Sequence, residues 1–115
     1  MSIFLDSYIA AALWSSTDSK EIALDENYGP ENIAPKALAR MREDCEDFQR
    51  VNAMLLAQAG DESQNGHDFW LTRNHHGAGF WDRGYPNNIG ELLTAAAHVY
   101  GSCGLYVGDY GRIYL

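Results

Sequence analysis

An apolar stripe between Pro35 and Gly60 is the sequence feature that most constrains the fold. From Leu38 to Leu55, apolar side chains recur at alternating steps of three and four residues, which is the spacing of one narrow helix face. Proline suits the first position of a helix because its missing N–H is not needed there, and glycine commonly ends one. The sequence therefore predicts a long amphipathic helix over 35–60, with Asn52 as the polar interruption of its stripe.

Two shorter helices are expected on either side of the long one. Over Ser7–Ser15 the apolar residues again follow helical spacing, and the preceding Asp6 is a suitable N-cap. A later helix is expected to start after Asn88, with Glu91 three residues on as its capping-box partner, and to end at Gly101. These patterns predict helices near both ends of the chain.

The remaining segments have the composition of β-hairpins. Residues 67–73 are rich in aromatic and β-branched types and predict a strand, followed by a turn over 74–77 and a second strand over 79–82. A second hairpin is expected from the strands 105–107 and 112–115. The element order is then ααββαββ, and we expect an α+β domain with a small antiparallel sheet of about four strands and helices mainly on one face.

Length and composition favour one domain over residues 1–115. The chain is 46% apolar, which suffices for a packed core, and its longest apolar run is far shorter than the roughly 20 residues that cross a membrane. No basic stretch typical of a secretory signal opens the sequence. Cys45 and Cys103 lie far apart and form no metal-binding or redox motif. We therefore expect a protein of a reducing cytoplasm that binds no membrane, metal or cofactor.

The charge is strongly acidic and unevenly distributed. There are 16 acidic and 8 basic side chains, and residues 1–66 hold twelve of the acidic ones against five basic. Direct binding of nucleic acid is disfavoured because it requires clustered Lys and Arg. Four acidic residues on the long helix predict a surface for a basic partner: Glu43, Asp44, Glu46 and Asp47. A face that only keeps the protein in solution explains the same pattern.

The expected central hairpin carries a polar cluster and two tryptophans. Arg73 and Asp82 would lie on paired strands and form a cross-strand ion pair, and Asp82 with His75 or His76 would be suited to acid–base chemistry. The sequence lacks a nucleophile elbow, a phosphate-binding loop and a zinc spacing. No catalytic residue is therefore assigned, and Trp70 with Trp81 indicates a second possibility, docking through the hairpin.

A long central segment carries a family resemblance. Its residues 67–84 read HDFWLTRNHHGAGFWDRG, and further elements lie at 11–18, 32–35 and 106–111. With these elements the chain resembles a family of small acidic proteins encoded by bacteriophages, plasmids and other bacterial mobile elements, mostly of unassigned activity. The family typically has glycine where His75 stands and an acidic residue where Tyr110 stands.

The resemblance implies a bacterial host cytoplasm and a role against host defence. We expect a non-catalytic accessory protein that inhibits a nucleic-acid-binding machine of the host (a CRISPR complex, nuclease or restriction enzyme), with acidic groups in place of DNA phosphates. Contacts are expected at the four acidic helix residues and at Trp70, Arg73, His76 and Asp82. The alternatives are a module that docks or forms a homodimer through its aromatic hairpin, and a small hydrolase or nucleotide-handling enzyme that uses Arg73, His76 and Asp82.

Overall fold

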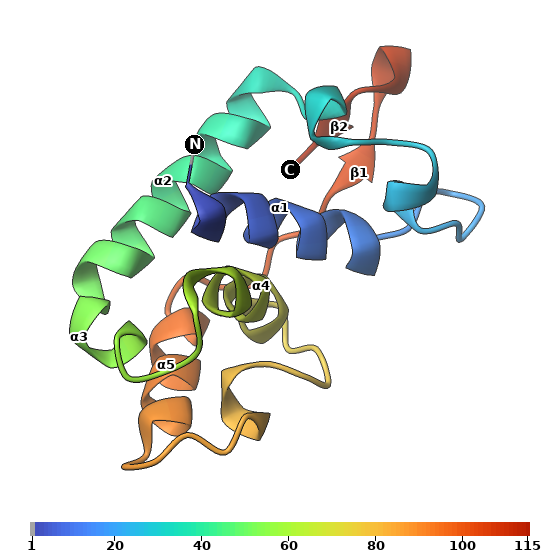
Figure 1. Cartoon of the computed structure of the whole chain (residues 1–115). Helices are drawn as coiled ribbons and strands as arrows, with labels where there is room; N and C mark the ends of the chain where they lie inside the picture. Colours follow the sequence, from blue (N-terminus) through green and yellow to red (C-terminus); the bar gives the residue numbers. More distant parts are fainter. Residues whose placement is uncertain (1) are drawn as a thin grey trace.

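Helices dominate the fold of residues 2–115, the part of the chain that the computed structural model describes (Figure 1). Within these residues the elements are α1 (Ile3–Ser15), α2 (Pro35–Val51), α3 (Ala53–Leu56), α4 (Glu62–Arg73), α5 (Ile89–His98) and the strands β1 (Tyr106–Val107) and β2 (Ile113–Tyr114). Short 3₁₀ turns lie at Leu24–Glu26, Pro30–Asn32, Phe80–Asp82 and Asp109–Gly111. The expected α+β domain with a four-stranded sheet is therefore wrong, because the only sheet among the described residues has two strands.

The core is built where α1 and α4 cross closely. Gly66 of α4 lies against the backbone of α1, and a Cβ atom there would be 2.1 Å from the carbonyl oxygen of Phe4. Around this contact the rings of Phe48 and Phe69 stack with their centroids 4.0 Å apart, and the ring of Tyr8 lies 5.3 Å from Phe69. The small residue allows two helices that are distant in sequence to share one aromatic core.

Helix α4 replaces the predicted strand over 67–73. Asp61 caps the helix by accepting a hydrogen bond from the backbone N–H of Gln64 at 2.8 Å. The consecutive residues Phe69, Trp70 and Leu71 are all buried, because α4 is surrounded by other elements. A helix covered on several sides shows no alternation of polar and apolar faces, and its burial overrides the β-preference of its aromatic residues.

The predicted strand over 79–82 is a 3₁₀ turn instead, so the central hairpin does not exist. Gly79 has a φ of 158°, and the backbone N–H of Phe80 donates to the Thr72 hydroxyl at 3.1 Å. The Asp82 carboxylate accepts from the backbone N–H of Gly79 at 3.1 Å. The backbone N–H groups of Gly79 and Phe80, which would bond to a neighbouring strand in a hairpin, donate instead to Asp82 within the turn and to Thr72 of α4.

Three predicted helix ends also need correction. Helix α1 starts earlier than expected, because Ser2 caps it by accepting from the N–H of Leu5, and Asp6 lies inside the helix. The predicted long helix is divided into α2 and α3 at Asn52, whose ψ of 23° departs from the helix. Asn88 has a φ of 61° and makes no capping hydrogen bond to α5, so the expected capping box is absent.

The C-terminal hairpin is confirmed. Tyr106 pairs with Tyr114 and Val107 with Ile113 in antiparallel register. The Ile113 carbonyl also accepts from the N–H of Ala34 at 2.8 Å, which joins the hairpin to the start of α2. None of the helices among residues 2–115 combines the length and the apolar character needed to span a membrane.

Candidate functional site

Arg73, at the end of α4, lies in the core with a complete set of partners. Its Nη1 donates to a carboxylate oxygen of Asp44 at 2.7 Å and to the Tyr8 hydroxyl at 3.0 Å. Its Nε and Nη2 donate to the backbone carbonyls of Gly101 and Tyr100, each at 2.9 Å. Arg73 is only 1% exposed, so its charge holds helices together and does not face a partner.

Two of the four acidic residues predicted as a contact surface are therefore used inside the molecule. Asp44 neutralises Arg73, and Asp47 accepts hydrogen bonds from the Tyr100 hydroxyl and from Arg50. The hydrogen bond from Tyr100, followed by that from Arg50, lowers the pKa of the Asp47 carboxyl. These two carboxylates position α2 against α4 and the end of α5. They are therefore less available to a basic partner than the sequence suggested.

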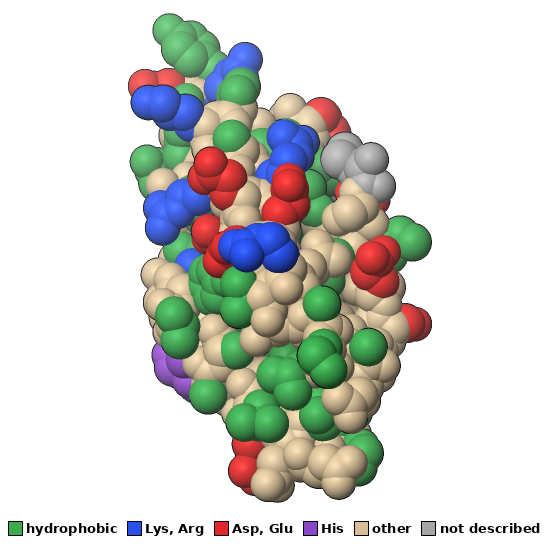
Figure 2. All heavy atoms as spheres, turned by 90° about the vertical axis from the view of Figure 1, so that its left-hand side faces the viewer, with side chains coloured by type: hydrophobic (Ala, Val, Ile, Leu, Met, Phe, Trp, Pro, Cys, Tyr) green, Lys and Arg blue, Asp and Glu red, His purple; other side chains and the backbone are tan. Residues whose placement is uncertain are grey.

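Over the whole of α2 the acidic and basic side chains are equal in number, four of each. Glu43 and Glu46 are exposed, but basic residues stand beside them along the same helix: Lys36, Arg40, Arg42 and Arg50. Figure 2 shows acidic and basic side chains intermingled on this face. Residues 1–34, in contrast, carry six acidic side chains and one basic. The negative surplus of the chain therefore lies largely on α1 and the connection after it, and α2 contributes none of it.

A second buried ion pair supports the outer side of α4. Asp68 is fully buried and accepts two hydrogen bonds from Arg83, at 2.8 and 3.0 Å, and one from Gln64 at 3.0 Å. The hydrogen bond to Asp68 raises the pKa of Arg83, so the guanidinium of Arg83 stays charged. His67 Nδ1 lies 3.5 Å from the same carboxylate. Because Arg83 already neutralises Asp68, this carboxylate is poorly placed to activate His67 as a base.

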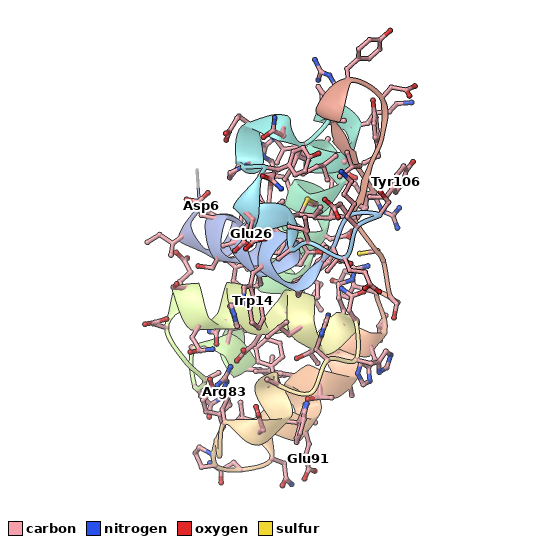
Figure 3. All side chains as sticks on the ribbon, turned by 90° about the vertical axis from the view of Figure 1, so that its right-hand side faces the viewer. Asp6, Trp14, Glu26, Arg83, Glu91 and Tyr106 are labelled. Carbon is pink, nitrogen blue, oxygen red and sulfur yellow. The ribbon has the colours of Figure 1, made fainter. Side chains whose placement is uncertain are left out.

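Next to this ion pair lies an open hollow of about 450 Å³, the α1–α4 groove. It is lined by Ser7, Ala10, Asp61, Ser63, Gln64, His67 and Arg83. The side chain of Trp14, at the end of α1, is 58% exposed, and its ring lies 6.2 Å from the ring of His67. Figure 3 shows Asp6, Trp14 and Arg83 along one side of the ribbon, with Tyr106 on the other.

The groove combines three kinds of group that suit a cationic side chain. Asp61 supplies an exposed carboxylate, the hydroxyls of Ser7 and Ser63 lie 2.7 Å apart, and Trp14 supplies an aromatic face beside the groove. Aromatic faces attract ammonium and guanidinium groups, and carboxylates do so more strongly. Within residues 2–115 no three His, Cys, Asp or Glu side chains are placed to hold a metal ion, and both cysteines are free.

The other residues predicted as a site are dispersed. Trp70 is buried and its Nε1 donates to the Ser15 hydroxyl at 2.8 Å, so it belongs to the core. Trp81 is 53% exposed and His76 is exposed. Asp82 lies beside Arg83 and not beside Arg73, because the cross-strand pair needed a hairpin that does not form. The cluster that an Arg73, His76 and Asp82 enzyme would use is not assembled.

Sequence reasoning missed the residues that the structure gathers around the groove. Asp61 directly follows the long helix predicted over 35–60, and Trp14 lies near the end of the helix predicted over Ser7–Ser15. The available signal was the polar run before His67, since Asp61 is a good N-cap and Ser63 and His67 are one helical turn apart. A helix beginning at that cap places both side chains on one face.

Comparison of the chain with protein families, with curated proteins and with solved structures finds no match.

Proposed function

We propose that this protein is a non-catalytic inhibitor that binds a Lys- and Arg-rich, nucleic-acid-binding surface of a host defence protein and blocks access of DNA or RNA to it. The observation that carries the proposal is the Asp61 carboxylate in the wall of a groove flanked by the exposed Trp14, in a chain whose residues 1–34 carry six acidic side chains and one basic. Excess charge of one sign accelerates the encounter with an oppositely charged surface, and a buried aromatic anchor then slows dissociation. The resemblance to mobile-element proteins fits the same role.

The contact surface of this proposal is the α1–α4 groove with its flanks, and not α2. Asp6 is exposed on α1, and Asp61 lies in the groove wall. A lysine or arginine of the partner would place its charge near Asp61 and its stem against Trp14. The exposed Glu43 of α2, in contrast, stands among basic neighbours, so its contribution to steering is small.

Capture from a bacterial lysate tests this proposal. The tagged protein is incubated with nuclease-treated lysate at about 50 mM and about 500 mM salt, and bound protein is then released with duplex DNA. We expect a basic nucleic-acid-binding protein that is retained at low salt, weakened at high salt and displaced by DNA. Mass spectrometry identifies it, and binding is then measured with the purified partner.

Matched variants locate the surface. Asp6→Lys and Trp14→Ala should each weaken binding by about tenfold or more, as expected for a steering charge and an anchor. Glu43→Lys makes the same charge change on α2, and Trp81→Ala removes another half-exposed tryptophan, so both should bind as the unmodified protein does. A partner that neither duplex DNA nor RNA displaces, or equal binding by all four variants, would refute the proposal.

A further inference from the structure

Four large apolar side chains are exposed around α3 and α5, and we call them the apolar α3–α5 face. They are Val51 at 63% exposure, Met54 at 83%, Leu92 at 49% and Val99 at 84%. Figure 2 shows hydrophobic side chains gathered over the lower half of this view and charged ones over the upper half. Several large apolar side chains exposed on one face are typical of an interaction site.

The helices explain why these side chains share one face. Leu92 lies in α5, and Val99 directly follows the last residue of this helix. The two are seven residues apart, which is close to two helical turns, so their side chains lie on the same side of the helix. The Tyr100 hydroxyl donates to Asp47, and this hydrogen bond holds the end of α5 against the last turns of α2, next to Val51. Met54 projects from α3, which packs against α5.

Charge indicates which partner fits. The chain carries a net charge of −8, so two copies repel one another over most of their surface. The exception is α2, which has four acidic and four basic residues and borders the apolar α3–α5 face. Exposed Arg42 and Arg50 stand close to exposed Glu43 and Glu46 along this helix. A surface with both signs can pair with itself about a two-fold axis.

We propose that the occupant of the apolar α3–α5 face is a second copy of this chain, in a symmetric homodimer with α2 of each copy at the rim. The apolar side chains supply the buried centre, and the exposed charges of both signs on α2 set the relative orientation. The proposal does not depend on the inhibitory function, because none of the residues lining the α1–α4 groove belongs to this face.

Sedimentation velocity and light scattering test the dimer. At about 100 μM, well above a micromolar dissociation constant, the protein should have twice the mass of one 12.8-kDa chain. Met54→Glu and Val99→Glu, made separately on two elements, should each raise the dissociation constant by at least about tenfold. Tyr110→Glu, at a side chain 99% exposed elsewhere, is the control and should leave the mass unchanged.

Each outcome decides the matter. Both substituted side chains are more than four-fifths exposed, so circular dichroism should show that the variants fold normally. Dissociation constants at least about tenfold higher in both variants, measured over a dilution series from about 100 μM, beside an unchanged value for the Tyr110→Glu control, support the proposal. A single-chain mass for the unmodified protein, or dimers of unchanged affinity in both variants, would overturn it. Binding to the partner captured from lysate is measured separately with the groove variants, so failure of one proposal leaves the other standing.

Discussion

Replacing Asp44 by alanine should destabilise the protein far more than replacing its neighbour Glu43. The two substitutions remove the same charge from adjacent positions of α2, but only Asp44 pairs with Arg73, which is 1% exposed. Breaking a buried ion pair costs about 3–5 kcal/mol. The Asp44 side chain is 23% exposed and Arg73 keeps its other acceptors, so we expect about 2–3 kcal/mol for Asp44→Ala. Glu43→Ala should stay within about 0.5 kcal/mol.

Urea unfolding followed by circular dichroism measures this difference. With a slope of about 1.5 kcal/mol per molar urea, Asp44→Ala should lower the midpoint by about 1.3–2 M, against about 0.3 M for Glu43→Ala. Arg73→Met and the double variant complete a double-mutant cycle. The double variant should lose about 1 kcal/mol or more less stability than the sum of the losses of the two single variants. Equal midpoints for the two alanine variants would show that Arg73 does not need a carboxylate partner, and would refute a stabilising role for the Asp44–Arg73 ion pair.

Three further predictions concern the fold. Gly66→Ala should lower the free energy of unfolding by about 3 kcal/mol or more, because its Cβ would collide with the backbone of α1. Gly77→Ala should be tolerated, because a Cβ there would have no atom within 4 Å, and thermal unfolding compares the two variants. Burial raises the pKa of the Tyr8 hydroxyl well above the usual value of about 10. Above about pH 10 the unfolded chain therefore loses this proton and the folded chain keeps it, so the urea midpoint should fall as the pH rises further. A urea midpoint that does not change with pH in this range would contradict the prediction. Acrylamide should quench the other two tryptophans and spare Trp70, so Trp70→Phe should remove the least quenched emission.

The sequence predicted those elements whose start, buried face or turn is determined by residues within the element itself. Pro35 marks the start of α2, and the buried residues of its stripe, such as Met41 and Phe48, follow the helical period because one face of α2 meets the core. The C-terminal hairpin was found because Gly111, with a φ of 69°, permits a turn between two short apolar segments. Helix α4 was missed because its period is hidden by burial on several sides, which depends on contacts with distant helices.

The candidate site shows the same limit for charge. The sequence contains the negative surplus but does not tell an aspartate that faces solvent from one that neutralises a buried arginine. Asp44 and Glu43 are neighbours of the same sign, and only the position of Arg73 on another helix separates their roles. The groove was unpredictable for a related reason, since its walls come from α1 and α4, which are brought together by Gly66.

The pairing of α1 with α4 also has a consequence during synthesis on the ribosome. Helix α1 emerges before α4, and the surface that covers its apolar side is complete only when Arg73 has been made. At about 5–20 residues per second, the roughly 60 residues between them take about 3–12 s. During that interval the buried side chains Phe4 and Ile9 lack the cover that α4 supplies. The nascent chain therefore displays an early binding site for chaperones, which closes when α4 arrives.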